Sequence, residues 1–386
     1  MRNLLPLPSR DTTMKPTKST CDDPRLQPDD VIRMQPDDVI RTQPDDVFRL
    51  QPDDVFRLQS DDVFRLQPCE DGSLTVHSAL HDQCFHSSAG AILESRYIYL
   101  ELGLKAYLSA RQNAALQNAA RREQADETAL NEQDGETSRR EQIGETSRSE
   151  QSDGVSILEI GFGSGINALL CAIEFENARR NRICCDNAQT DLDKPQTDLN
   201  NATSNCENAT SNLDNILAFP EEIYFESIEL YPIPEEIWSQ LDYASLLAAS
   251  DSERNHRIDS ERDHRINIDR DQIKAIFEKI HRAPWNQVCE ILPGFKLHKR
   301  HEDILTFMPA AQYQVVFFDA FSPDCQPELW SKEVFAKIKE KLLPGAVMST
   351  YSSKGFVKQH LRDLGFEVRR KPGPGHKRHV LQAISH

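Results

Sequence analysis

Residues 155–170, VSILEIGFGSGINALL, join a hydrophobic run to a glycine-rich turn and then to a second hydrophobic run. This order predicts a buried strand over 155–160, a tight turn, and a helix that begins near Asn167. Three alternating glycines, Gly161, Gly163 and Gly165, stand in the turn. A strand, a glycine turn and a helix in this order are typical of α/β folds that bind a nucleotide beyond the strand end.

The spacing of these glycines separates two classes of cofactor. A dinucleotide turn follows G-x-G-x-x-G, in which the last glycine lets the helix close on the strand. Counted from Gly161, that position is Ile166, so the dinucleotide pattern fails. The observed E-x-G-x-G-x-G pattern is instead typical of a turn whose backbone approaches the methionine end of S-adenosylmethionine. Glu159 then stands where it can hold the ammonium group of that cofactor, directly or through water. An oxidoreductase that transfers hydride is the alternative.

Strand and helix patterns alternate along the rest of the ordered chain. Further strands are expected over 222–230, 296–305, 313–321, 345–351, 366–370 and 378–384, and helices over 328–342 and 354–364. Such alternation indicates a parallel sheet that is covered on both faces. We therefore predict an α/β, Rossmann-like fold with a mostly parallel seven-stranded sheet that ends in a C-terminal antiparallel hairpin.

Repetitive segments interrupt this pattern. Residues 27–66 repeat an eight-residue unit five times, and four of the five units contain proline. A period of eight fits neither a helix nor the usual solenoid repeats, so residues 1–68 are predicted to form a disordered tail. Low-complexity inserts near 111–153, 186–215 and 250–272 are expected within a single domain over 69–386. Long surface inserts are tolerated because they add little loop-closure entropy.

The charge of the chain is unevenly distributed. The formal net charge is −17, and residues 22–68, 121–153 and 186–215 together carry −16 of it. Residues 354–386, in contrast, hold eight Lys or Arg and only two acids. This basic end predicts a surface for nucleic-acid phosphates, with an ordinary solvated hairpin as the alternative.

Cysteine usage and hydropathy indicate a cytoplasmic protein that does not enter the membrane. The nine cysteines lack a paired C-x-x-C framework, and no run approaches 18 apolar residues. His77, His81, Cys84 and His86 have a spacing that suits a metal site on a helix. The sequence around His77 indicates a strand or turn instead, so we predict no metal.

Acidic residues follow three of the expected strands. Ligands of parallel sheets bind beyond the carboxyl ends of the strands. Glu229 ends the second strand and is placed to accept hydrogen bonds from ribose hydroxyls. Asp303 follows the third strand and is placed to accept from the adenine amino group, or else to cap a helix. Asp319 ends the apolar fourth strand, where an unpartnered carboxylate is costly to bury, and we predict a functional role for it.

Four motifs together resemble a known family. They are FHSSAGAILESRYIYL (85–100), FFDAFSPDCQPELW (317–330), YSSKGFV (351–357) and KPGPGHKRHVL (371–381). In this order they resemble the methyltransferase domain of the bacterial tRNA 5-methylaminomethyl-2-thiouridine biosynthesis bifunctional family. The resemblance covers roughly 69–106, 153–183, 220–240 and 284–386 and is strongest to the stand-alone form that lacks the FAD oxidase domain.

The resemblance implies an activity. Members transfer a methyl group from S-adenosylmethionine to the 5-aminomethyl group of wobble (2-thio)uridine in tRNA, giving 5-methylaminomethyl-2-thiouridine. It implies tRNA as partner and a separate FAD-dependent or other enzyme that supplies the precursor. A methyltransferase acting on a small-molecule amine and a non-catalytic methyltransferase-fold scaffold are the alternatives.

The resemblance also assigns roles to residues. The residues that match its cofactor-binding positions are Glu159, Gly161, Gly163, Gly165, Glu229, Asp303 and Asp319. Those that match positions shaping the acceptor pocket are Pro327, Trp330, Gly355 and Phe356. Lys377 and Arg378 imply a retained RNA surface.

Elementary chemistry agrees with a carboxylate at the acceptor. An alkylamine is protonated at neutral pH, so it must lose a proton before it attacks a methyl group. Asp319 is expected to orient the amine and help that proton to leave. Phe321, Trp330 and Tyr351 are expected to stack on an extruded base, with core packing as the alternative for each.

Overall fold

The computed structural model describes residues 63–132, 154–192, 219–253, 268–375 and 377–386. The chain divides into two compact units, Met1–Leu50 and Gln51–His386. The first unit lies outside the described residues, as do most of the octapeptide repeats and much of the three predicted inserts. The fold described below is therefore that of the second unit.

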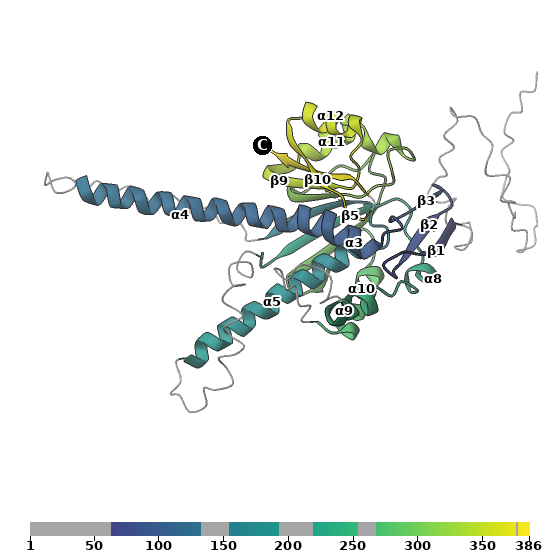
Figure 1. Ribbon diagram of the computed structural model, residues 1–386, viewed down its shortest axis with the longest axis horizontal. Helices are drawn as coiled ribbons and strands as arrows, with labels where there is room; N and C mark the ends of the chain where they lie inside the picture. The colour runs from purple at the N-terminus through teal and green to yellow at the C-terminus, as the bar shows by residue number, and fades with distance from the viewer. Residues whose placement is uncertain (1–62, 133–153, 193–218, 254–267, 376) are drawn as a thin grey trace, which may run out of the picture. The chain divides into compact units, whose positions relative to one another are not determined.

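An eight-stranded sheet forms the centre of this unit (Figure 1). Its five parallel strands lie in the spatial order β9, β8, β4, β5, β7. They span Leu342–Thr350 (β9), Tyr313–Phe318 (β8), Val155–Ile160 (β4), Ile223–Glu229 (β5) and Phe295–His301 (β7). The predicted α/β class with a mostly parallel sheet is confirmed.

Antiparallel strands lie at both edges of the sheet. At one edge β11 (His379–Ser385) pairs with β9 and with β10 (Phe366–Pro372), which is the predicted C-terminal hairpin. At the other edge β6 (Val288–Leu292) pairs with β7. The predicted count of seven strands is wrong because β6 was missed. In this five-residue edge strand only Ile291 is buried, and Glu290 interrupts the hydrophobic residues, so the sequence lacks the continuous hydrophobic run of a central strand.

Helices cover both faces of the sheet (Figure 1). On one face lie α3, η1, α4, α5, α8, α9 and α10, which span Ala91–Ser95, Arg96–Lys105, Ala106–Glu132, Ile166–Leu192, Glu235–Trp238, Tyr243–Glu253 and Arg270–Arg282. On the other lie η3, α11 and α12, which span Pro327–Trp330, Lys332–Lys339 and Gly355–Asp363. The predicted helix over 328–342 is thus split by Ser331, which caps α11 through a bond from the Val334 amide.

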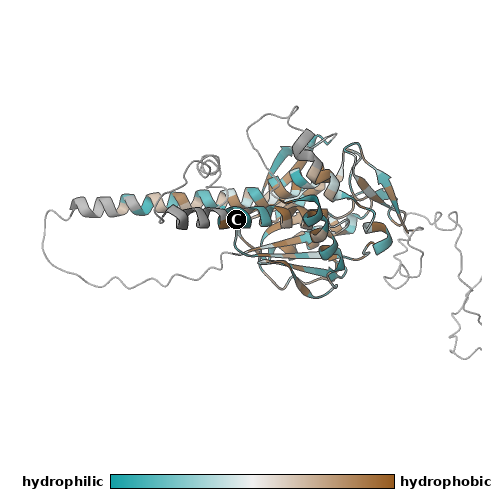
Figure 2. Cartoon of the chain, turned by 90° about the horizontal axis from the view of Figure 1, so that it is seen from below, coloured by the Kyte–Doolittle hydropathy of each residue, from teal (hydrophilic) through white to brown (hydrophobic). Residues whose placement is uncertain are grey.

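The hydrophobic residues of the strands form one core layer on each face. Along β8, Val315 and Phe317 pack on one side while Val316 and Phe318 pack on the other. Figure 2 shows hydrophobic segments concentrated in the sheet and in the helix faces that adjoin it. Because both faces are covered, the central strands are nearly continuous hydrophobic runs, as parallel strands generally are.

The helical segment that carries the N-terminal motif has an unusual central part. Residues Arg96–Lys105 form a ten-residue π-helix, η1, between α3 and α4. Such helices are rare, usually single turns, and often occur at functional sites. A Cβ atom at Gly103 would lie 2.8 Å from the Phe317 ring and from Ser349 Oγ. Glycine therefore lets η1 pack directly against the sheet.

Two segments form regular secondary structure where a low-complexity insert or a disordered tail was predicted. Residues 106–132, part of which were predicted as an insert, form helix α4, in which most residues from Ser109 to Arg122 are exposed. A small antiparallel sheet also forms from β1 (Phe64–Pro68), β2 (Leu74–Ser78) and β3 (Gln83–Cys84). Residues 64–68 therefore belong to a strand and not to a disordered tail.

Within the described residues, no helix has both the length and the hydrophobicity that a membrane crossing requires.

Candidate active site

The glycine turn lies where β4 ends and α5 begins. Gly161, Gly163 and Gly165 have φ values of +92°, +50° and +71°, which L side chains rarely adopt. A Cβ atom at Gly161 would also lie 2.7 Å from the backbone oxygen of Asp319. Gly161 is therefore required by the close passage of the turn past the end of β8, and the positive φ values favour glycine at all three positions.

A cluster of buried aromatic and basic side chains packs against the glycine turn. His281 Nε2 lies 3.1 Å from the Ser164 carbonyl oxygen, and Lys299 Nζ donates to the His281 carbonyl at 2.5 Å. The Lys299 ammonium also lies 4.8 Å from the centroid of the Trp285 ring. Burial lowers the pKa of His281 to about 3, so this imidazole is neutral and its N–H fixes the Ser164 carbonyl.

Two carboxylates flank the turn as predicted, and each has a different environment. Glu159 is fully buried on β4, where Oε2 accepts from Ser227 Oγ at 2.5 Å. Its Oε1 has no hydrogen-bond partner among the described residues, and burial raises the pKa well above the ordinary value. Glu229 accepts from the amides of Gly163 at 3.1 Å and Tyr231 at 2.9 Å. The unpartnered Glu159 oxygen is a ready acceptor for a cationic donor.

Asp319 stands just beyond the end of β8. Its Oδ1 accepts from the Tyr99 hydroxyl at 2.6 Å, and its Oδ2 accepts from Asn167 Nδ2 at 2.9 Å. Burial raises its pKa to about 7, although both hydrogen bonds act in the opposite direction. A carboxylate with a pKa near neutrality exchanges protons readily at physiological pH, which is what general acid–base chemistry requires.

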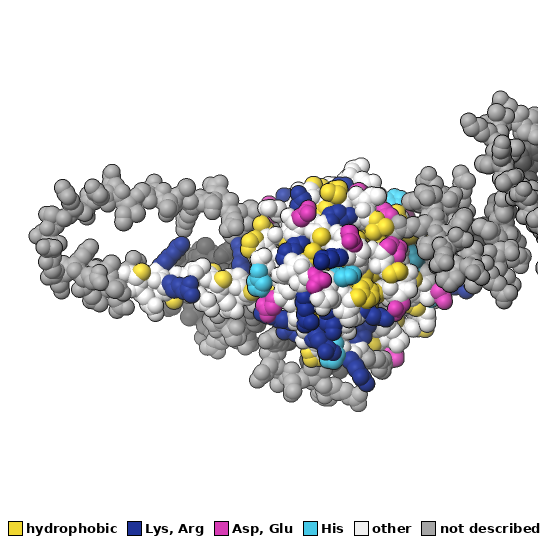
Figure 3. Space-filling model, turned by 90° about the horizontal axis from the view of Figure 1, so that it is seen from above, with side chains coloured by type: hydrophobic (Ala, Val, Ile, Leu, Met, Phe, Trp, Pro, Cys, Tyr) yellow, Lys and Arg dark blue, Asp and Glu magenta, His cyan; other side chains and the backbone are white. Residues whose placement is uncertain are grey.

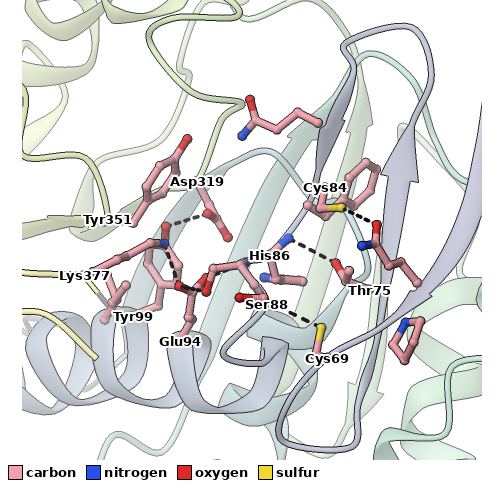
Figure 4. A pocket seen from close by; sticks show the side chains of 16 residues that line it. Cys69, Thr75, Cys84, His86, Ser88, Glu94, Tyr99, Asp319, Tyr351 and Lys377 are labelled. Carbon is pink, nitrogen blue, oxygen red and sulfur yellow. Dashed lines mark hydrogen bonds and ion pairs between the residues drawn. The ribbon is translucent and has the colours of Figure 1, made fainter. Parts of the chain in front are cut away.

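Asp319 lines a cavity of about 380 Å³ (Figure 4). Figure 4 shows Tyr99, Asp319, Glu94 and Lys377 gathered at one end of this pocket, whereas Cys69 and Cys84 lie toward the other. The remaining lining residues are Gln67, Pro68, Thr75, Gln83, Phe85, His86, Ser87, Ser88, Ile98 and Tyr351. One end of the pocket is thus charged, and the other is polar but neutral.

An ion pair crosses the charged end of the pocket. Lys377 Nζ lies 2.7 Å from Glu94 Oε1 and 4.6 Å from the centroid of the Tyr351 ring. Ser87 donates to Glu94 from both its amide and its hydroxyl. Burial acts to raise the pKa of Glu94, but the Lys377 charge and these hydrogen bonds bring it below the ordinary value. Glu94 therefore stays ionised, while Asp319 titrates near neutrality.

The small sheet forms the wall of the pocket opposite Asp319. His86 Nε2 lies 3.0 Å from Ser164 Oγ, which joins this wall to the glycine turn. The His81 ring stacks on Phe321 with 4.3 Å between centroids, and Gln83 accepts from the Ser322 amide at 3.2 Å. The described residues include no group of three His, Cys, Asp or Glu side chains arranged to hold a metal ion.

Several predicted acceptor residues do not line the pocket. Trp330 is fully buried between Phe318 and Phe335, and its Nε1 donates to the Phe321 carbonyl at 2.8 Å. The stacking role predicted for Trp330 is therefore corrected to a role in the core. Phe321 packs on the small sheet, and of the three predicted stacking residues only Tyr351 lines the pocket.

Other predicted residues lie at the surface or in turns. Asp303 Oδ1 accepts from the Leu305 amide at 2.9 Å, so its carboxylate stabilises a local turn and does not cap a helix, which was the alternative predicted for it. Phe356, at the start of α12, is 42% exposed, and neither it nor Gly355 lines the pocket. Arg378 is exposed on the hairpin loop, whereas Lys377 points into the pocket.

Sequence reasoning assigned no role to three residues that complete the site: Glu94, Tyr99 and Asn167. Glu94 and Tyr99 lie within the motif over 85–100, and Asn167 follows the glycine turn directly. The motif was therefore a usable signal. Tyr99 and Asp319 are 220 residues apart in the sequence, so their hydrogen bond depends on the tertiary fold.

The C-terminal part of the chain is similar to known proteins. Residues 278–386 match the family model described as S-adenosyl-L-methionine-dependent methyltransferase. This segment is therefore similar to S-adenosylmethionine-dependent methyltransferases. The predicted enzyme class and the predicted cofactor, S-adenosylmethionine, are confirmed at this level.

Curated relatives match shorter stretches. The tRNA 5-methylaminomethyl-2-thiouridine biosynthesis bifunctional protein MnmC of Stutzerimonas stutzeri is 37% identical over 82 residues, 21% of this chain and 12% of that protein. The protein of the same name from Chromohalobacter salexigens is 45% identical over 65 residues, 17% of this chain and 9% of that protein. The matches thus span a small part of each relative.

Among solved structures, MNMC2 from Aquifex aeolicus is similar with a TM-score of 0.45 and 18% sequence identity. That comparison covers 83% of this chain and 70% of the other.

Proposed function

We propose that this chain transfers a methyl group from S-adenosylmethionine to the amino group of 5-aminomethyl (2-thio)uridine at the wobble position of tRNA. The observation that carries the proposal is Asp319, a carboxylate with a pKa near 7 at the end of a pocket and beside the glycine turn. The curated relatives are named for biosynthesis of 5-methylaminomethyl-2-thiouridine in tRNA, which supports this choice of acceptor.

The residues around the turn fit the cofactor. S-adenosylmethionine, when bound, supplies an electrophilic methyl group and carries a free ammonium group. The buried Glu159 Oε1 lacks a hydrogen-bond partner among the described residues and suits such an ammonium. Glu229, at the end of β5, is the acceptor available for ribose hydroxyls. Its carboxylate oxygens also accept hydrogen bonds from two backbone amides. The glycines leave room for a ligand to approach the backbone.

Asp319 is assigned the proton-handling step. A primary ammonium group has no lone pair with which to attack, so a base must remove one proton. The ionised Asp319 accepts a hydrogen bond from the incoming amine and holds it in line for attack. Tyr99 and Asn167 fix the two oxygens of the Asp319 carboxylate, so the carboxylate loses little conformational entropy when the amine binds. The wall formed by the small sheet limits the access of water to the same carboxylate.

The charge distribution supports an RNA acceptor. Figure 3 shows Lys and Arg side chains spread over the face that carries α11, α12 and β10. The exposed basic residues of these elements and of the adjoining loops are Lys332, Lys354, Arg362, Arg369, Arg370 and Arg378. Such a surface neutralises phosphates and binds RNA in a salt-dependent way. Of these residues, Arg378 directly follows Lys377, which lines the pocket. A tRNA acceptor implies that the protein works in the cytoplasm.

The test is methyl transfer to tRNA from cells that lack this methylation step, with labelled S-adenosylmethionine and mass analysis of the nucleosides. The expected product is labelled 5-methylaminomethyl-2-thiouridine. Asp319→Asn, which keeps the shape of the side chain but not its basicity, should lower the rate by about 100-fold or more. Asp324→Asn is the matched control because Asp324 is exposed in the same loop and pairs with Lys354 at 2.7 Å.

Two results would defeat the proposal. One is the absence of the labelled nucleoside with the unmodified protein. The other is full activity of Asp319→Asn. Methylation of a free polyamine, without any transfer to tRNA, would favour a small-molecule amine as the acceptor.

A further inference from the structure

The ion pair between Glu94 and Lys377 has no part in the methyl-transfer chemistry described above, although it lies next to Asp319. The side chain of Glu94 is 6% exposed and that of Lys377 is 27% exposed. Both line the same end of the pocket as Asp319 (Figure 4). Burying a charged pair costs free energy in itself. The position of the pair beside the acceptor site therefore suggests a functional role for it.

The pair has unused hydrogen-bonding capacity toward the pocket. An ammonium group has three N–H donors, and Lys377 uses one of them on Glu94 Oε1. Glu94 Oε1 also accepts from Ser87 Oγ, whereas Oε2 accepts only from the Ser87 amide at 3.1 Å. The pair therefore presents an N–H donor next to a carboxylate acceptor.

The two groups are held in place from several sides. The Tyr351 ring lies beneath the Lys377 ammonium, and Ser87 fixes the Glu94 carboxylate. Tyr351 is itself fixed because its hydroxyl donates to the Ala320 carbonyl at 2.8 Å. A donor and an acceptor in fixed positions can distinguish one base edge from another, because a mismatched edge leaves buried polar groups unpaired.

A uracil ring carries the complementary groups in a fixed order. Its C4 oxygen accepts hydrogen bonds, and the neighbouring N3–H donates one. Because C5 is bonded to C4, an aminomethyl group at C5 that reaches Asp319 brings the C4 oxygen to the next polar group, Lys377. The N3–H then faces Glu94. Cytosine would instead place an amino donor against the Lys377 ammonium and an acceptor nitrogen against the Glu94 carboxylate.

We propose that Glu94 and Lys377 select uracil as the acceptor base, with Lys377 donating to O4 and Glu94 accepting from N3–H. This inference rests on the proposed function, since it presumes a 5-aminomethyl pyrimidine in the pocket. It adds a residue-level source of base specificity that is independent of the proton transfer at Asp319.

The experiment compares two synthetic anticodon stem–loop RNAs that differ only at the wobble base, 5-aminomethyluridine or 5-aminomethylcytidine. The ratio of kcat/KM for the two RNAs is measured for the unmodified protein and for its variants. We expect the unmodified protein to prefer uridine by about 100-fold, which is the upper part of the range for a bidentate base contact. Lys377→Met should reduce this preference to less than about 10-fold, chiefly through a slower reaction with uridine.

Two further variants keep the test decisive if Lys377→Met is unstable. Lys377→Gln retains an N–H donor and should keep more of the preference than Lys377→Met does. Glu94→Gln should also reduce the preference, because an amide accepts more weakly than a carboxylate. Lys105→Met is the matched control: Lys105 pairs with Glu101 at 3.0 Å and Glu174 at 3.1 Å and does not line the pocket. It should leave the ratio unchanged.

The outcomes separate this inference from the proposed function. An unchanged uridine preference in Lys377→Met and Glu94→Gln would overturn the inference while the methyl transfer itself stood. No transfer by the unmodified protein to either RNA would instead count against the proposed function.

Discussion

The two sides of the candidate active site are built in different ways. The turn side consists of Glu159, the three turn glycines and Glu229, and comes from the adjacent strands β4 and β5. The acceptor side consists of Glu94, Tyr99, Asp319, Tyr351 and Lys377, which four separate segments contribute. Backbone conformation fixes the first side, whereas hydrogen bonds and an ion pair between distant side chains fix the second.

This difference predicts different responses to mutation. On the turn side, an added Cβ atom at Gly161 meets backbone that cannot move away, and all three glycines have a positive φ that disfavours any side chain, so glycine substitutions should be severe and hard to rescue. On the acceptor side, isosteric substitutions preserve the fold and change protonation or specificity.

Gly161→Ala should have the largest effect. The new Cβ atom would lie 2.7 Å from the Asp319 backbone oxygen, at a φ of +92°. Even a 1 Å shift of catalytic groups lowers rates by about 100-fold, so we expect at least that loss of activity. The matched control is Gly345→Ala, since Gly345 has a φ of +79° but nothing within 4 Å of the added atom.

Gly345→Ala should lower stability by about 1–2 kcal/mol, the cost of the left-handed conformation, and keep most of the activity. Activity assays and thermal unfolding of both variants provide the comparison. Equal activities in the two alanine variants would show that the passage of the turn past β8 does not control the site.

Glu159→Gln should weaken cofactor binding while it stabilises the fold. Burial raises the pKa of Glu159 in the folded protein, so folding becomes less favourable as pH rises above the ordinary value of 4.5. Glutamine removes this cost, and we expect a melting temperature about 2–4 °C higher at pH 8. Affinity for S-adenosylmethionine should fall about 10-fold or more, because a charge-assisted hydrogen bond is lost.

Glu176→Gln, on the adjoining helix α5, provides the opposite case. Hydrogen bonds and charges from Arg179 and Arg180 outweigh burial and lower the pKa of Glu176. Its ionised form stabilises the fold above pH 4.5, and this stabilisation is lost as pH falls through its lowered pKa. Glutamine should therefore lower the melting temperature at pH 8. Calorimetry on both variants checks the sign, and a lower melting temperature for Glu159→Gln would contradict the account.

Local sequence patterns predicted the strand, the glycine turn and the helix of the turn side. The glycines, Glu159 and the strand that holds them are consecutive, and their conformation depends on neighbours in sequence. Asp319 was also predicted, because an acid at the end of an apolar strand is conspicuous. The strand β1 was missed since Phe64 and Arg65 belong to the last octapeptide unit and share its repetitive sequence.

The acceptor side was harder to predict because its contacts join distant segments. No spacing rule connects Tyr99 with Asp319, or Glu94 with Lys377. The motif that contains Trp330 indicated a residue near the acceptor, but not whether its side chain faces the pocket or the core. That orientation depends on the packing of Phe318 and Phe335, which only the assembled fold provides.

The most direct test of the central claim, that Asp319 must be ionised to receive the proton of the amine, is the pH dependence of kcat/KM in the unmodified protein and in Tyr99→Phe. The rate should rise through about pH 7 in the unmodified protein. Since the Tyr99 hydrogen bond lowers the pKa of Asp319, the rise should move to higher pH in Tyr99→Phe while the melting temperature changes little. A rise at the same pH in both proteins would contradict the assignment of Asp319 as the base.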